Sequence, residues 1–235
     1  GEPDRLQGDD KACMSERPAG GASGEASSAG SETDHLETES AALLRRELTR
    51  WKFENHEVVA PQLVGLLADS GRFDDETAVG LARRALQAYP LLDIWLAKAL
   101  AGRDSQAMRR ILVILSEIAQ SNRILAPLTP VLRTKDDVVR SKAALLFARL
   151  CENPNFAEQF RKAGDRRVLA NAIEGFWGSR SPGARALMLA ATEETDNRTM
   201  ANAALGLHQL GDARGLAVLE RMLGHGGEHY RASAA

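Results

Sequence analysis

The sequence predicts an all-α fold, a right-handed α-solenoid built from antiparallel helix pairs. The first observation is a recurrence: DRRVLANAIEGFW, which starts at Asp165, returns at Asp196 as DNRTMANAALGLH. The interval is 31 residues, and a shortened copy, GEHYRASAA, begins at Gly227 after the same interval. A fixed period of this length is typical of stacked supersecondary units. The second observation is that no segment has the alternating polarity of a strand, which favours helices throughout.

The recurring segments have the apolar spacing of amphipathic helices, and we refer to them as the second helices of each repeat. In the copy that follows Asp136, apolar side chains fall at Val139, Ala143, Leu146 and Leu150, which lie on one helix face. An aspartate or serine at the start of a helix accepts hydrogen bonds from the free amides of the first turn. The copies are expected to start at Asp74, Ser105, Asp136, Asp165, Asp196 and Gly227.

Another apolar segment precedes each copy, so each period holds a first helix and a second helix. Glycine, aspartate, asparagine or serine follows every such segment and separates the two helices. Pro127 and Pro130 are expected to kink or shorten one first helix, because proline cannot donate the backbone hydrogen bond. About five to six repeats result, the last one truncated. The predicted first helices span roughly 58–68, 91–101, 123–133, 155–163, 182–193 and 213–223.

The beginning of the chain has a different composition. The first forty residues contain ten acidic and three basic side chains among many Gly, Ser and Ala residues. Such a segment cannot bury enough apolar surface to offset its ordering entropy, so residues 1–37 are predicted to be a disordered acidic leader or linker. We expect the solenoid to occupy residues 38–235, with a capping helix at 38–56 and repeats from about residue 57. The shortened last copy suggests a piece of a larger multidomain protein.

Composition narrows the function classes. Residues 41–235 hold 27 basic and 22 acidic side chains, a mildly basic balance that makes nucleic acid an unexpected partner. The two cysteines, Cys13 and Cys151, form no disulfide framework and favour a reducing compartment. No apolar run is long enough to cross a bilayer. We therefore expect a cytoplasmic protein without membrane insertion, and the sequence leaves its oligomeric state open.

The segment DDVVRSKAA from Asp136, the repeated Ala-Asn-Ala helices and the short glycine turns resemble HEAT repeats. The resemblance covers roughly residues 57–235 and is to the short class of about 31 residues found in bacterial and bilin-lyase-like proteins. It implies a protein-binding scaffold in which an aspartate and a nearby arginine link neighbouring repeats. The matching residues are Asp136 with Arg140, and Ser105 with Arg109. The next two copies depart from this pattern, with Leu169 and Met200 at the arginine position.

Polar side chains recur opposite the apolar stripe of the second helices. In helix-pair solenoids these helices commonly line the concave face, so the side chains are expected to form a ladder along a groove. Amides both donate and accept, and guanidinium groups suit carboxylates, which favours an acidic helix or extended peptide as ligand. Alternatively, the asparagines bond to neighbouring loops and the arginines pair with Asp165, Asp196 or Glu174. The predicted partner-binding residues are Lys142, Arg149, Arg167, Asn171, Glu174, Trp177, Arg198, Asn202, His208 and Gln209.

Aromatic and clustered basic residues have competing interpretations. Trp177 and His208 occupy equivalent positions in consecutive copies, and an exposed tryptophan is a common interface anchor. The alternative is that Trp177 fills the gap above Gly178 and Gly183. Arginine doublets such as Arg109–Arg110 are expected to lie on solvated helix faces.

The string HGGEH, from His225 to His229, matches the letters of an inverted zinc-peptidase motif. That chemistry requires both histidines on one face of a continuous helix. Two glycines lie between them, and the repeat register puts a turn at Gly227. We therefore expect neither a metal site nor a cofactor, and we nominate no catalytic residue.

The function that the sequence favours is a non-enzymatic scaffold that binds a partner protein or a neighbouring domain through its second helices. Two alternatives remain open at this stage. The first is a HEAT-like enzyme that excises alkylated bases from DNA, which would use an aromatic-lined basic groove and a catalytic aspartate. The second is a bilin-lyase-like protein that handles a chromophore, and it rests on the repeat resemblance alone.

Overall fold

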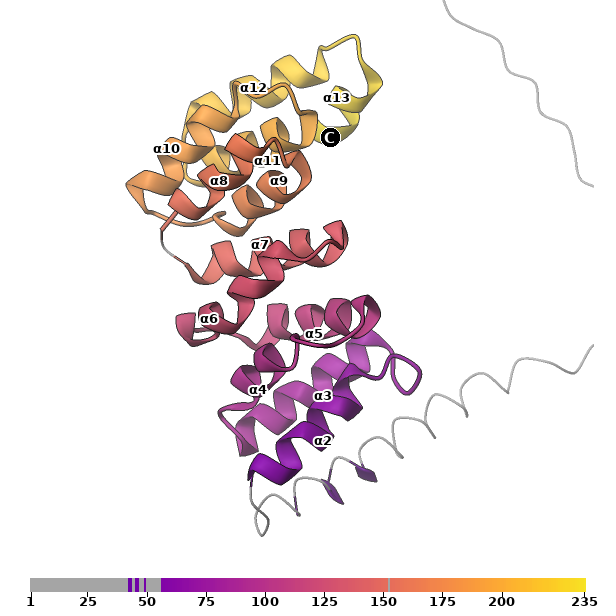
Figure 1. Cartoon of the computed structure of the whole chain (residues 1–235). Coiled ribbons are helices and arrows are strands. Elements are labelled where there is room, and N and C mark those ends of the chain that lie inside the picture. The colour runs from indigo at the N-terminus through magenta and orange to yellow at the C-terminus, as the bar shows by residue number, and fades with distance from the viewer. Residues whose placement is uncertain (1–41, 44, 47–48, 50–55, 152) are drawn as a thin grey trace, which may run out of the picture. The chain divides into compact units, whose positions relative to one another are not determined.

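The chain divides into two units, residues 1–38 and 39–235, and every residue that the structure describes belongs to the second unit. The regular elements of this described part are all helices (Figure 1). None of these helices combines the length and the apolar character needed to cross a bilayer. The predicted leader, 1–37, and most of the predicted capping helix, 38–56, lie outside the described residues. The computed structural model describes residues 42–43, 45–46, 49, 56–151 and 153–235.

The first helices occupy the predicted segments. The third first helix is broken into a 3-10 turn η1 (Asn122–Ile124), a short α6 (Leu125–Leu128) and a second 3-10 turn η2 (Thr129–Arg133). The prediction that Pro127 and Pro130 shorten this helix is confirmed. The other first helices are α2 (His56–Ala68), α4 (Leu92–Lys98), α8 (Asn155–Ala163), α10 (Pro182–Ala191) and α12 (Ala213–Leu223).

Except the last, whose N-cap is Gly227, the second helices begin after aspartates that accept backbone N–H groups of the first turn, as at Asp74, Asp136, Asp165 and Asp196. One predicted start is wrong by a residue: α5 is capped by Asp104, whose carboxylate accepts from the N–H of Ala107 at 2.9 Å, whereas Ser105 is the first helical residue. The second helices are α3 (Asp75–Ala88), α5 (Ser105–Ile118), α7 (Asp137–Leu150), α9 (Arg166–Gly175), α11 (Asn197–Gln209) and α13 (Glu228–Ala234).

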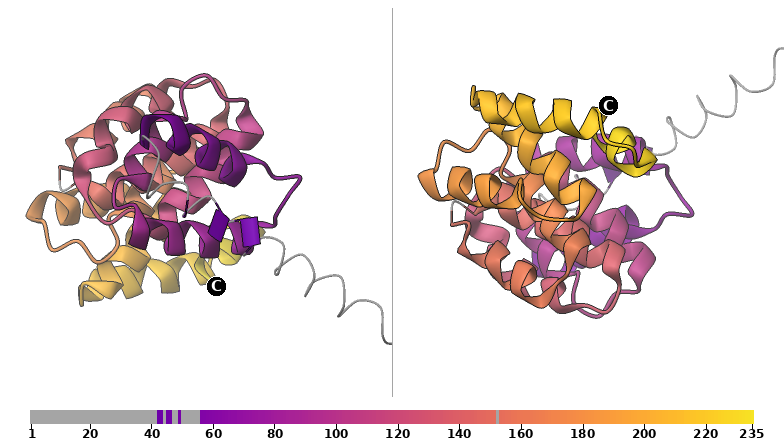
Figure 2. Two further views of the ribbon diagram at one scale, coloured as in Figure 1. Left: turned by 90° about the horizontal axis from the view of Figure 1, so that it is seen from below. Right: turned by 90° about the horizontal axis from the view of Figure 1, so that it is seen from above.

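Consecutive second helices pack against each other, from α3 with α5 through to α11 with α13. Figure 1 shows the helix pairs following one another in chain order, and the views from below and above in Figure 2 likewise show only helices and loops in the described part. Because each unit contacts mainly its neighbours, the fold is an α-solenoid. The aliphatic core runs between the helices, and the recurring alanines, Ala172 and Ala203, are fully buried in it.

The glycine that recurs in the second helices lies at a close contact between repeats. A Cβ atom added to Gly175 of α9 would lie 2.3 Å from the carbonyl oxygen of Leu145 in α7. One added to Gly206 of α11 would lie 2.5 Å from Met188 Sδ and 2.8 Å from Trp177 Cδ1. The recurrence of glycine is therefore explained by helix packing, because any side chain would force the neighbours apart.

Candidate functional site

Arginines of the second helices bind the aspartate that caps the following second helix. Arg109 of α5 lies 2.8 Å from Asp136, and Arg140 of α7 lies 2.8 Å from Asp165. The predicted polar links between repeats are confirmed for these residues, and in each link the arginine reaches forward to the aspartate of the next repeat. The backbone N–H of Val139, followed by the side chains of Ser105 and Arg109, holds the pKa of Asp136 well below its usual range.

Arg110 contradicts the expectation that the arginine doublets are solvated. Its side chain is 4% exposed, and its guanidinium donates to the carbonyl oxygens of Leu67, Phe73 and Asp74. Its Nη1 lies 2.9 Å from the carboxylate of Asp75. These acceptors end α2 and begin α3, so Arg110 holds the preceding repeat in place rather than contributing to a ligand surface.

The junction between α9 and α11 uses several of the predicted ladder residues internally. Arg198 Nη2 donates to Asn171 Oδ1 at 2.8 Å and lies 3.9 Å from Glu174. Asn202 Nδ2 donates to the carbonyl oxygen of Ala170 at 2.9 Å. Asn171 is buried, which corrects its predicted place on the exposed ladder. Since Leu169 cannot form the arginine link, these amide contacts connect the two repeats instead.

Trp177 also belongs to this junction. Its indole N–H donates to the carbonyl oxygen of Asn202 at 2.8 Å, and its ring lies against Gly206. It thus closes a gap over Gly206, not over Gly178 and Gly183. His208, the equivalent residue one repeat later, is exposed, and its side chain has no hydrogen bond within the described part of the chain.

The remaining ladder residues face solvent. Arg149 is exposed and donates one hydrogen bond to the carbonyl oxygen of Ser116. The side chains of Lys142, Arg167 and Gln209 are exposed and make no hydrogen bond or ion pair with any described residue. These side chains, together with His208, are the part of the predicted site that the array leaves available.

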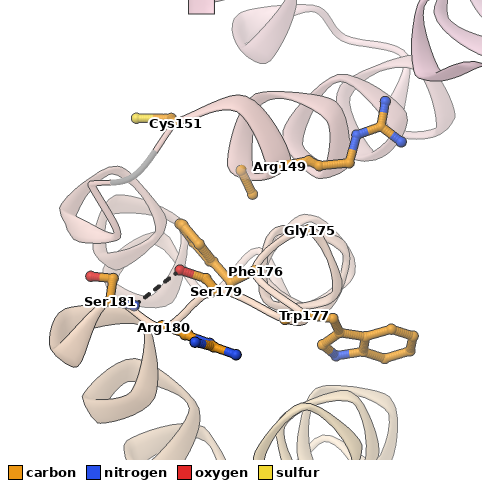
Figure 3. A pocket seen from close by; sticks show the side chains of 10 residues that line it. Arg149, Cys151, Gly175, Phe176, Trp177, Ser179, Arg180 and Ser181 are labelled. Atoms are coloured by element: carbon orange, nitrogen blue, oxygen red, sulfur yellow. Dashed lines mark hydrogen bonds between the residues drawn. The ribbon is translucent and has the colours of Figure 1, made fainter. Parts of the chain in front are cut away.

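A pocket of about 500 Å³ lies where the ends of α7 and α9 meet the loop leading to α10. Figure 3 shows Arg149 extending from α7, Trp177 at the end of α9, and Arg180 on the loop. Ser179 Oγ accepts the backbone N–H of Ser181 at 3.3 Å, which orders the loop. Arg180 is exposed and unpaired among the described residues, and none of the residues lining the pocket is acidic.

The HGGEH string does not form the helix that a zinc peptidase requires. Gly227 precedes α13, so His225 lies outside the helix that carries His229. His225 Nδ1 accepts the backbone N–H of Gly227 at 3.0 Å, and its ring packs on Tyr230. In the portion of the chain that the structure describes, no three His, Cys, Asp or Glu side chains are grouped so as to hold a metal ion.

Comparison with known proteins identifies repeats in the C-terminal part of the chain. The family model described as HEAT repeats matches residues 153–235, which include α8 to α13. Residues 153–235 contain HEAT repeats. A crystal structure of an engineered protein is 18% identical, with 74% of this chain and 93% of that chain covered, but its TM-score is 0.36. No curated protein matches the sequence.

Sequence reasoning missed two features of the helix array. Arg180 was not singled out, because it stands in a loop outside the repeat register, although its place in a Gly-Ser-Arg-Ser-Pro turn marks an ordered connection. The buried role of Arg110 was also missed. A signal was present, since Arg110 falls in line with the apolar residues Ile114 and Ala107 at helical spacing.

Proposed function

We propose that the chain is a non-enzymatic scaffold of the cytoplasm that binds a partner protein, or a neighbouring domain, through its second helices α7, α9 and α11. HEAT repeats generally serve as protein-interaction scaffolds, which supports the general class of function. The partner carries an acidic segment. The binding surface consists of the exposed side chains that the array does not use for its own stability.

The single observation that carries this proposal is the contrast between paired and unpaired polar residues on the second helices. Arg109, Arg140 and Arg198 are engaged by neighbouring repeats. Lys142 and Arg167 lie on the same set of helices, are exposed, and have no partner among the described residues. Side chains without a structural partner are available to an acidic ligand, and guanidinium groups bind carboxylates with good geometry.

Charge reversal tests this proposal. In the variant Lys142→Glu/Arg167→Glu, two positive charges on the binding surface become negative. The control variant Arg133→Glu/Arg221→Glu makes the same change in charge on the first-helix elements η2 and α12. Arg133 and Arg221 are exposed and likewise unpaired among the described residues, so both variants should fold. Proteins captured by the wild-type chain and identified by mass spectrometry should be lost only with the first variant. If both variants still capture the same proteins, the second-helix surface is not the binding site.

A further inference from the structure

The junction between α9 and α11 supplies its own acceptors for an arginine. Arg198 stands two residues after the capping Asp196 and donates to Asn171 Oδ1 at 2.8 Å. It also lies 3.9 Å from the carboxylate of Glu174. Asn171 and Glu174 stand six and nine residues after Asp165, which caps α9. An amide oxygen and a carboxylate thus face the arginine of the following helix.

The preceding junction, between α7 and α9, lacks both acceptors. Arg167 again stands two residues after its cap, Asp165. Six and nine residues after Asp136, the cap of α7, stand Lys142 and Leu145. In the repeat register, Lys142 therefore occupies the position of Asn171, and Leu145 occupies the position of Glu174. Neither Lys142 nor Arg167 is paired within the described residues.

Two like charges at one junction repel each other, and an anion placed between them lowers the electrostatic energy. The ammonium of Lys142 and the guanidinium of Arg167 together offer several N–H donors, and charge-assisted hydrogen bonds to carboxylates are stronger than neutral ones. The backbone around them is already fixed, because Gly175 allows α7 and α9 to pack closely. On this side of the interface, binding therefore orders only side chains.

We propose that the α7–α9 junction binds a carboxylate side chain from an acidic segment of the partner protein, between Lys142 and Arg167. The ligand's carboxylate takes the place that Glu174 fills in the next junction. This inference rests on the proposed function, because the partner supplies the acid. It predicts that an acid introduced into the chain itself at Leu145 competes with the ligand.

The test uses an acetylated, amidated octaglutamate peptide as the probe and an octaglutamine peptide as the uncharged control. Leu145→Glu copies Glu174 into the α7–α9 junction, and Lys142→Asn copies Asn171. Leu205→Glu adds the same charge at the equivalent position of α11 and serves as the matched control. Calorimetric titration should show octaglutamate binding to the wild type, weakened about tenfold by Leu145→Glu or Lys142→Asn but little changed by Leu205→Glu.

The urea midpoint of each variant identifies any loss of folding, and Lys142→Asn, at an exposed position, keeps the test valid if Leu145→Glu unfolds. Equal weakening by Leu145→Glu and Leu205→Glu would mean a general charge effect and would overturn the inference. Binding of a phosphoserine peptide without binding of octaglutamate would overturn the choice of a carboxylate. If Lys142→Glu/Arg167→Glu abolishes partner capture while Leu145→Glu and Lys142→Asn leave it intact, this inference fails and the proposed function stands.

Discussion

Replacing Gly175 by alanine should destabilise the array, although alanine normally favours helices. The added Cβ atom would lie 2.3 Å from Leu145 O, 2.5 Å from Ala148 Cβ and 3.1 Å from Arg149 N. Because two of these three atoms belong to the backbone of α7, relief requires the two helices to separate. Overpacking of this kind costs about 1–3 kcal/mol, against a gain of at most about 1 kcal/mol from helix propensity. We expect a net loss of about 1–2 kcal/mol.

Gly80 provides a matched control in the interior of α3, because a Cβ atom added there meets nothing within 4 Å. The same substitution at Gly80 should raise stability by about 0.5–1 kcal/mol, since glycine costs conformational entropy in a helix interior. Urea unfolding followed by circular dichroism measures both variants. A Gly175→Ala variant as stable as the wild type, or more stable, would refute the close packing of α7 against α9.

Three further predictions concern single side chains. Arg110→Met should lower the free energy of unfolding by about 2–4 kcal/mol, because it leaves buried carbonyl oxygens without a donor. Arg109→Met should lower it by about 1 kcal/mol or less, because its ion pair with Asp136 is exposed. Urea titration of the two variants measures both free energies. The Arg214 side chain, ahead of its backbone N–H, lowers the pKa of Asp212 from 3.8 to about 2. Ionised Asp212 therefore contributes stability above pH 3.8 that is lost as the pH falls toward 2, and the stability difference between the wild type and Asp212→Asn should narrow in urea titrations over that range. Ser141 Oγ is buried without a hydrogen-bond partner, so Ser141→Ala should raise the free energy of unfolding by about 1 kcal/mol and raise the thermal midpoint. A lower midpoint would show that the Ser141 hydroxyl makes a hydrogen bond in the folded protein.

Much of the helix pattern could be predicted from the sequence because local chemistry determines it. Aspartates such as Asp136 and Asp196 end one turn and cap the next helix through contacts with residues two or three positions away. Pro127 and Pro130 act within their own segment in the same way. Helix positions that depend on neighbours in sequence were therefore predictable to within a few residues, with α5 starting one residue away from its predicted cap and α4 ending at Lys98.

The candidate site was less predictable because it depends on contacts between repeats. A helical wheel places Asn171 opposite the apolar stripe, but it does not show how closely α11 approaches, and that helix buries the side chain. Arg110 bonds to Leu67, 43 residues earlier, which no local pattern reveals. Conversely, Lys142 and Arg167 were placed on the polar face and are exposed there, because nothing in the neighbouring helices pairs with them among the described residues. Their role in binding stays a prediction.

Site-specific photocrosslinking tests the central claim most directly. A photoreactive residue at Gln209, exposed on the second helix α11, would report contact with the second helices, and one at Arg221, exposed on the first helix α12, would report contact with the first helices. With the captured partner, the proposed function predicts covalent adducts from position 209 and few or none from position 221. Adducts that form mainly from position 221 would contradict it, because the partner would then be held by the first helices.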